Sequence, residues 1–134
     1  GDFEQSPFLS IIIPAYNEEQ RLPPTLVRVA DFLRRQPFRS ELLIVENGST
    51  DNTSAVVERF CQEYVRPEDP FRVHLLHTGQ GKGVAVKHGM LSARGEYRVM
   101  SDADLAVPIE EVTKFLPPVL PARSFDVAIA SREG

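Results

Sequence analysis

Short apolar runs alternate along the chain with longer segments in which apolar residues recur at helical spacing. The runs occupy residues 9–13, 41–46, 71–77, 97–100 and 125–130, and turns rich in proline, glycine or polar residues follow them. Short runs that are apolar on both sides of the backbone are typical of strands buried on both faces of a parallel sheet. The sequence therefore predicts five strands.

The segments between these runs are predicted to be helices. The first is expected to begin in the polar stretch 17–20, or at Pro23 and Pro24, because proline fits the first turn of a helix. It is expected to end before Pro37. The others are expected after the turn 47–51, from the glycine loop 79–83 to about residue 94, and from Pro108 to Pro117. This alternation predicts an α/β, Rossmann-like fold with a mostly parallel sheet and helices on both faces.

Composition narrows the class of protein. The 134 residues are 42% hydrophobic and 25% charged, with a formal net charge of -4. This is the profile of a single soluble domain, and the mildly acidic balance argues against a nucleic-acid partner. The only cysteine, Cys61, excludes an intrachain disulfide, which fits a reducing, cytoplasmic location. No apolar run is long enough to cross a membrane, and no secretory signal is visible.

The most informative motif follows the run 97–100, where Asp102 and Asp104 stand two residues apart. In open α/β sheets the ligand crevice lies outside the carboxyl ends of the strands. Two carboxylates at the end of a strand there can converge on a hard divalent cation, Mg²⁺ or Mn²⁺. Phosphate groups of the substrate then complete the coordination of this cation. The motif alone leaves open that both are solvated turn residues.

Two further loops carry groups that suit a nucleotide. Pro14 is expected to close the first strand and to leave the following backbone groups free to hydrogen-bond to the edge of a nucleobase. Tyr16 could pack against the flat face of that base. Asn47 offers an acceptor and donors, a pattern that matches uracil. Alternatively, the first loop is a simple strand-to-helix turn, and Asn47 begins a turn whose residues 49–51 cap the next helix.

The glycine loop 79–83 is neither a P-loop nor a clean dinucleotide fingerprint. Leu76 stands where a P-loop would have its first glycine, and Gly83, not serine or threonine, follows Lys82. Lys82 at a helix N-terminus would suit a phosphate or a nucleotide carbonyl. The alternative is a solvated surface lysine.

Together, the motifs 14–19, 46–51, 81–83 and 102–108 resemble the inverting GT-A-fold glycosyltransferases of the large family 2, above all the dolichyl- and polyprenyl-phosphate glucosyltransferases. The resemblance implies a nucleotide-diphosphate sugar donor of the UDP-glucose type, a polyprenyl-phosphate acceptor and Mg²⁺ or Mn²⁺. It implies metal binding by Asp102 and Asp104. The nucleotide contacts it implies are Pro14, Ala15, Tyr16, Glu18, Asn47, Lys82 and Asp102.

The sequence departs from this family in two respects. Glu46 and Asn47 stand where the family commonly has two aspartates, which leaves the choice between UDP and GDP open. Members continue beyond the fifth strand with the acceptor wall and the catalytic base. Residues 1–134 are thus expected to be one donor-binding domain, with the base and any membrane attachment elsewhere and with some tendency to self-associate. A nucleotidyltransferase and a non-catalytic nucleotide-binding module remain the alternatives.

Overall fold

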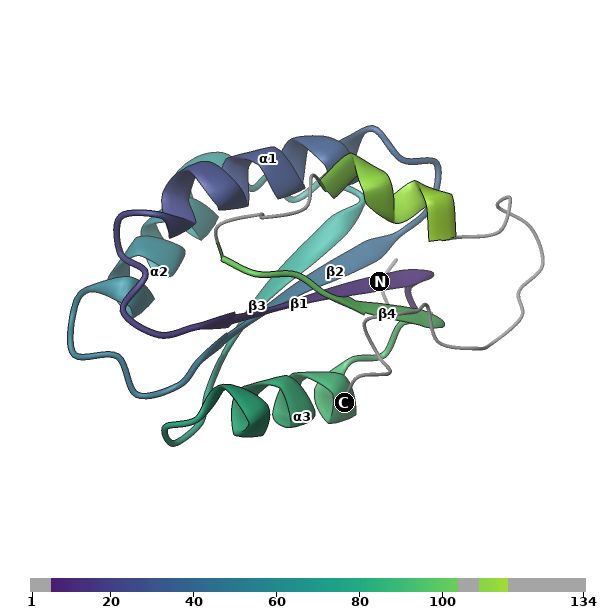
Figure 1. Cartoon of the computed structure of the whole chain (residues 1–134). Helices are drawn as coiled ribbons and strands as arrows, with labels where there is room; N and C mark the ends of the chain where they lie inside the picture. The colour runs from purple at the N-terminus through teal and green to yellow at the C-terminus, as the bar shows by residue number, and fades with distance from the viewer. Residues whose placement is uncertain (1–5, 104–108, 116–134) are drawn as a thin grey trace.

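The computed structural model describes residues 6–103 and 109–115, which form a parallel sheet with the strand order β3-β2-β1-β4 (Figure 1). The strands are β1 Leu9–Ala15, β2 Ser40–Glu46, β3 Phe71–His77 and β4 Tyr97–Met100. The helices are α1 Leu22–Arg34, α2 Thr53–Tyr64, α3 Lys82–Ser92 and the 3-10 helix η2 Ile109–Phe115. Helices α1 and α2 lie on one face of the sheet and α3 lies on the other (Figure 1). The predicted α/β fold is confirmed.

The individual elements follow the predictions closely, with differences at their ends. Strands β3 and β4 have the expected bounds, and β2 begins one residue earlier than expected. The predicted fourth helix is a 3-10 helix that begins at Ile109. The strand predicted over residues 125–130 lies outside the described residues.

Pro14 lies inside β1, contrary to the prediction that it closes this strand. It pairs in register with Val45 of β2, and β1 continues to Ala15. On its other side, β1 pairs with β4 only as far as Ile12, whose carbonyl accepts a hydrogen bond from the Ser101 N–H. In a parallel sheet the N–H and C=O groups of one strand residue point to the same neighbouring strand, and those of the next residue point to the strand on the other side. Ile12 and Pro14 therefore both face β4. The missing N–H of Pro14 therefore falls on the side where β4 has already ended.

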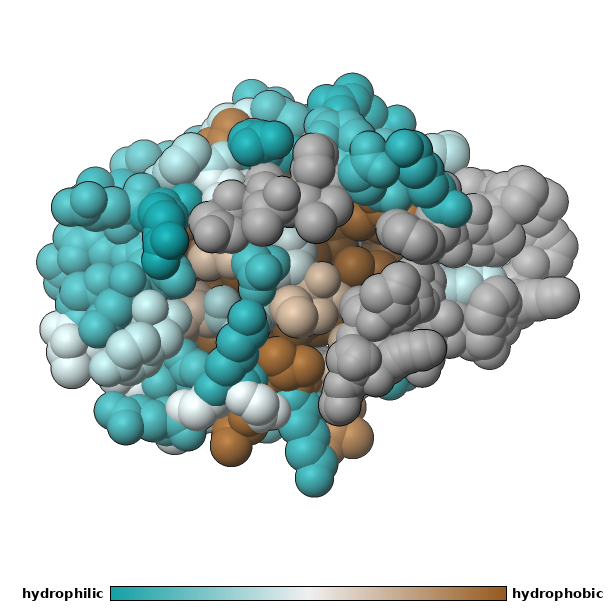
Figure 2. Space-filling model, in the orientation of Figure 1, coloured by the Kyte–Doolittle hydropathy of each residue, from teal (hydrophilic) through white to brown (hydrophobic). Residues whose placement is uncertain are grey.

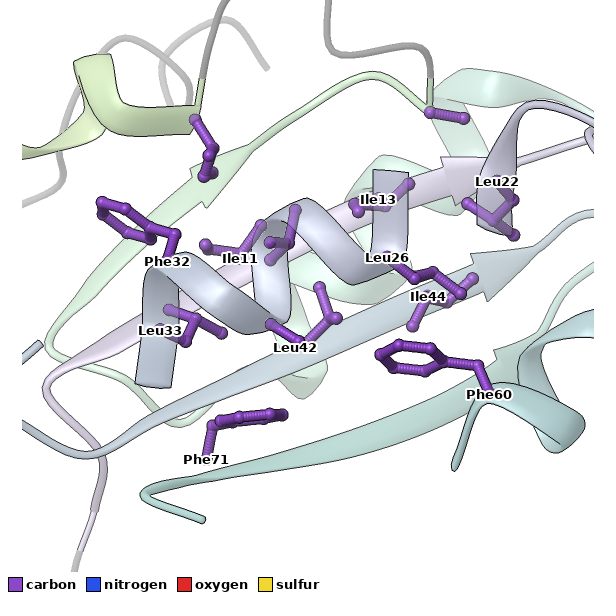
Figure 3. Close-up of a cluster of buried hydrophobic side chains, with 14 of the residues drawn as sticks. Ile11, Ile13, Leu22, Leu26, Phe32, Leu33, Leu42, Ile44, Phe60 and Phe71 are labelled. Carbon is purple, nitrogen blue, oxygen red and sulfur yellow. The ribbon is translucent and has the colours of Figure 1, made fainter. Parts of the chain in front are cut away.

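The larger hydrophobic cluster lies between the sheet and helices α1 and α2 (Figure 3). Successive strand residues point to opposite faces, so alternate positions of β1 and β2 supply its floor. Each large apolar side chain that is fully buried contributes roughly 1.5–3 kcal/mol. Its labelled members include Ile11, Ile13, Leu26, Phe32, Leu33, Leu42, Ile44, Phe60 and Phe71.

The opposite face of the sheet carries a smaller cluster beneath α3, which includes Ile12 and Val45. Gly89 lets this helix approach closely, because a Cβ atom there would lie 2.5 Å from Ile12 Cγ2 and 3.1 Å from Val45 Cγ2. The close contact fixes α3 against β1 and β2, and thereby fixes its first residue, Lys82, at the carboxyl edge of the sheet.

Hydrophilic residues cover much of the face shown in Figure 2, and hydrophobic surface gathers near its middle, around the position of β4 in Figure 1. Within the described residues, β4 is one edge of the sheet and β3 is the other. No helix in the described ranges has the length and apolar character needed to span a bilayer.

Candidate functional site

A hollow of about 280 Å³ opens at the carboxyl edge of the sheet. It is lined by Pro14 near the end of β1, by residues that follow β1, β2 and β4, and by the first residue of α3. The chain winds from β1 to β2 to β3 and then returns to place β4 on the other side of β1. Such a reversal splays the loops apart and opens a crevice. The lining residues are Pro14, Tyr16, Glu18, Asn47, Lys82, Asp102 and Ala103.

Most residues predicted to contact a nucleotide meet at this hollow, although they come from four separate segments. Ala15 differs, since its side chain is buried and its carbonyl accepts a hydrogen bond from the Asn47 N–H at 3.0 Å. The backbone at Ala15 therefore does not offer the free carbonyl that the sequence led us to expect. Ala103, which the sequence analysis did not single out, lines the hollow next to Asp102.

Asn47 carries the most unusual polar group of the hollow. The residue is 3% exposed, and its Oδ1 has no hydrogen-bond partner among the described residues. Buried polar atoms nearly always have a partner, because an unpaired one costs about 1–3 kcal/mol. The Asn47 side chain therefore contributes to the lining of the hollow a buried acceptor that has no partner among the described residues.

The carboxylate of Glu46 holds the turn that presents Asn47. It accepts hydrogen bonds from the backbone N–H of Ser49 and from the ring of His77, whose Nδ1 lies 3.0 Å from Oε1. Burial opposes ionisation of Glu46, but the hydrogen bonds from His77 and Ser49 outweigh it and lower the pKa of this carboxyl below its ordinary value. The turn also needs Gly48, since its φ of +91° lies in the left-handed region.

Lys82 and Asp102 form an ion pair at the hollow, with Nζ 2.9 Å from Oδ1. Both side chains are substantially exposed, at 61% and 45%, so solvent weakens this attraction and leaves both groups accessible to a ligand.

The backbone on both sides of Asp102 is anchored. The preceding N–H, of Ser101, donates to the Ile12 carbonyl at 2.8 Å, and the following carbonyl, of Ala103, accepts the hydroxyl of Thr25 in α1 at 2.5 Å. These two bonds hold the backbone of Asp102 at the end of β4. Thr25 was not predicted to have this role, because its partner is 78 positions away in the sequence.

The described carboxylate at this edge, that of Asp102, is a ligand that suits a divalent cation of the hard class. Asp104, the second predicted metal ligand, lies outside the described residues. Within residues 6–103 and 109–115, no three His, Cys, Asp or Glu side chains converge into a metal cluster. Mg²⁺, however, commonly binds through one or two carboxylates and completes its coordination with waters and substrate phosphates. The exposed Asp102 carboxylate beside the hollow suits that arrangement.

The loops after β1 and β2 are joined by hydrogen bonds between residues more than 30 positions apart in the sequence. Residues 49–51 were one candidate cap for α2, and Asp51 does bond to the start of this helix, because its Oδ1 accepts the Thr53 N–H at 3.0 Å. The N-cap residue itself, Asn52, makes no side-chain cap bond. Asn17 was expected to lie near the start of α1, yet the N-cap of that helix is Arg21. Polar side chains of each loop also accept hydrogen bonds from backbone N–H groups of the other.

A second hollow, of about 400 Å³, lies at the opposite edge of the sheet between the loops 36–39 and 67–70. Its buried acid, Asp69, is already held by Arg34, whose Nε and Nη2 each lie 2.8 Å from a carboxylate oxygen. The smaller hollow combines a lysine, an aspartate and a buried acceptor that no described group pairs with. We therefore take it as the candidate site.

The profile of the family described as Glycosyl transferase family 2 matches residues 10–133 of this chain. The dolichyl-phosphate beta-glucosyltransferase of Mus musculus is 40% identical over 111 residues, which cover 79% of this chain and 34% of the relative. The chain thus spans about a third of the length of the curated relatives it matches.

Two solved structures share the arrangement of the described elements. A mannosyltransferase from Pyrobaculum calidifontis, in complex with GDP-Man and Mn²⁺, has a TM-score of 0.66 and 26% identity and covers 81% of this chain and 31% of its own. TarS from S. aureus, in complex with UDP, has a TM-score of 0.51 and 28% identity over 72% of this chain and 27% of its own. The likeness to the mannosyltransferase confirms the predicted GT-A fold.

Proposed function

Because the chain belongs to glycosyl transferase family 2, we propose that it forms the donor-binding part of an enzyme that transfers glucose from UDP-glucose to a polyprenyl phosphate such as dolichyl phosphate. The 40% identity to the mouse dolichyl-phosphate beta-glucosyltransferase supports the sugar and the acceptor. The observation that carries the proposal is the buried Asn47 Oδ1, which has no partner within the described ranges, in a hollow that also presents Lys82 and Asp102.

In this proposal Asn47 reads the base. Its Oδ1 accepts the N3–H of uracil, and its amide can donate to the adjacent carbonyl. Tyr16, which is 44% exposed beside the hollow, packs against the flat face of the ring. Guanine also has an N–H beside a carbonyl, so GDP is the second choice. Adenine and cytosine place an amino N–H beside a ring nitrogen, which an asparagine amide can also pair with, so Asn47 does not by itself discriminate against them.

The other end of the hollow receives the ribose and the diphosphate. Lys82, at the N-terminus of α3, donates to a phosphate oxygen, where the helix dipole also favours negative charge. Asp102 faces the ribose or the metal side of the diphosphate. A divalent cation held by Asp102 and Asp104 would neutralise the charge on the leaving group.

The transfer step forms a bond between an oxygen of the acceptor phosphate and the anomeric carbon of the sugar. The bond from that carbon to the diphosphate oxygen breaks, and its electron pair leaves with UDP. Attack from the face opposite the leaving group inverts the configuration. A phosphate acceptor is already anionic, so the attacking oxygen needs no deprotonation. No described residue of this chain is assigned as a catalytic base.

The proposal is tested by incubating the full-length protein with radiolabelled UDP-glucose, dolichyl phosphate and Mn²⁺, and by extracting the lipid. We expect label in the lipid fraction, a β-anomeric product and loss of transfer when the metal is chelated. The absence of labelled lipid from both UDP-glucose and GDP-mannose would contradict the proposal. Formation of UDP-glucose from UTP and glucose 1-phosphate would indicate a nucleotidyltransferase instead.

A further inference from the structure

We propose that Asn17 is a positioning residue that fixes the base-binding end of the hollow by fastening the loop after β1 to the loop after β2. This inference rests on the proposed function, because it concerns the same nucleotide site. Asn17 stands between Tyr16 and Glu18, which line one side of the hollow, and its partners follow Asn47, which lines the other.

Asn17 bonds to the second loop in both directions. Its backbone N–H donates to Ser49 Oγ at 2.9 Å, and its side-chain Oδ1 accepts the backbone N–H of Thr50 at 2.8 Å. The Thr50 hydroxyl adds a longer bond to the same Oδ1, at 3.4 Å. One residue therefore joins the two loops through its main chain and its side chain at once.

The next two residues of the first loop extend this connection. The N–H of Glu18 donates to Thr53 Oγ1 at 2.9 Å, and the N–H of Glu19 donates to Asp51 Oδ2 at 3.2 Å. In return, the N–H of Asn52 donates to Glu19 Oε1 at 3.2 Å. Successive backbone amides of the first loop are thus paired with side chains of the second. We call the bonds of residues 17–19 to residues 49–53 the loop clasp.

The loop clasp determines how far apart the two proposed base contacts lie, because one contact is in each of the two loops that it joins. Tyr16 immediately precedes Asn17, and Asn47 lies two positions before Ser49. Beyond the paired ends of β1 and β2, the clasp sets the separation between the Tyr16 ring and the Asn47 amide. A flat base placed between these side chains requires that separation to be held.

The backbone of Asn17 explains which residue types fit. Its φ of 52° is in the left-handed region, which asparagine, aspartate and glycine adopt more readily than other residues. Asn17→Asp keeps the conformation and an oxygen acceptor for Thr50. Asn17→Gly keeps the conformation and removes that acceptor. The pair of variants therefore separates loss of the bond from backbone strain.

The test is calorimetric titration of the full-length protein and its variants with uridine and with UDP. We expect Asn17→Gly to weaken the binding of both ligands by the same factor, about tenfold, and Asn17→Asp to stay within roughly twofold of the native protein. Equal factors place the effect at the base and not at the diphosphate. In the transfer assay, the KM for the donor should rise while kcat is retained. Ser49→Ala, which removes the other half of the link, should act in the same direction.

The matched control is Ser10→Ala, near the amino end of β1 and therefore at the end of the sheet away from the hollow. It removes the bond from Ser10 Oγ to the buried Glu41 carboxylate, 2.6 Å long, and should lower the thermal midpoint without changing uridine affinity. The inference is overturned if Asn17→Gly binds uridine like the native protein, if Asn17→Asp is as weak as Asn17→Gly, or if Ser10→Ala weakens uridine equally. Failure of the native protein itself to bind UDP would overturn the proposed function, and this inference with it.

Discussion

Lys82 Nζ lies 2.9 Å from Asp102 Oδ1, so the cation of the glycine loop and the first acid of the Asp-x-Asp motif already neutralise one another at the hollow. A diphosphate and a divalent cation would each compete for one partner of this pair. The pair therefore links the affinity of the site for phosphate to its affinity for metal.

Lys82→Met should change these two affinities in opposite directions. Loss of the ammonium group should weaken the binding of UDP, because a phosphate contact is removed. It should also strengthen the binding of Mn²⁺ without nucleotide, by less than about tenfold, because the pair is exposed and solvent-screened. Both affinities can be measured by calorimetry, with uridine, which lacks phosphate, as the ligand whose affinity should not change. A uniform loss of all three affinities would indicate that the variant disturbs the fold.

Asn47→Leu should separate stability from binding. The substitution replaces a buried acceptor that has no partner in the described structure with an apolar side chain of similar size. We expect the thermal midpoint to be unchanged or raised, because the cost of an unpaired polar atom disappears. UDP affinity should fall by a free energy of about 1–3 kcal/mol, since the uracil N–H then loses its partner. Equal affinity for UDP in the native and variant proteins would exclude Asn47 from base recognition.

Two glycines of α3 should respond to alanine with opposite signs. At Gly89 a new Cβ would lie 2.5 Å from Ile12 Cγ2, and such overpacking typically costs about 1–3 kcal/mol. At Gly83 a new Cβ meets no described atom within 4 Å, so alanine should stabilise the helix by about 0.5–1 kcal/mol. Denaturant unfolding of the two variants measures both values. Stabilisation by Gly89→Ala would mean that α3 does not approach the sheet as closely as described.

The stability of the protein at acid pH should reveal how much the Glu46 carboxylate contributes to the free energy of unfolding. Its pKa is lowered in the folded protein, so its contribution to stability is present above the ordinary pKa of the unfolded chain and is lost as pH falls through the lower folded value. Glu46→Gln should therefore reduce the free energy of unfolding by about 1–3 kcal/mol at neutral pH, and the difference should shrink at acid pH below about 4. Glu63→Gln, at an exposed position of α2, is the surface control and should change stability at neutral pH by less than about 0.5 kcal/mol. A constant difference between native protein and Glu46→Gln across the acid range would contradict this assignment.

The alternation of apolar runs and helical segments was enough to predict the sheet, because each signal is local. Strand β3, residues Phe71–His77, follows directly from its apolar run and the turns beside it. The convergence of Asn47, Lys82 and Asp102 on one hollow was also predictable, since parallel strands bring their carboxyl ends to one edge.

The errors share a different physical origin. Pro14 continues β1 only because β4 ends early, a fact that belongs to another strand. Ser49 and Asp51 have the composition of a helix cap, and Asp51 does bond to the first amide of α2, but both side chains also bond to amides of a loop more than 30 positions earlier. Local propensity cannot distinguish these partners, because the competing groups meet only after the sheet has formed.

The most direct test of the account is to locate the nucleotide on the molecule. Amide chemical shifts of the isotope-labelled chain should be followed during titration with UDP and Mg²⁺. We expect the largest changes at Tyr16, Asn47, Lys82 and Asp102, around the hollow at the carboxyl edge of the sheet. Changes centred on Phe38, Arg39 and Arg72, at the opposite hollow, or no saturable change at all, would contradict the central claim that this edge binds a nucleoside diphosphate.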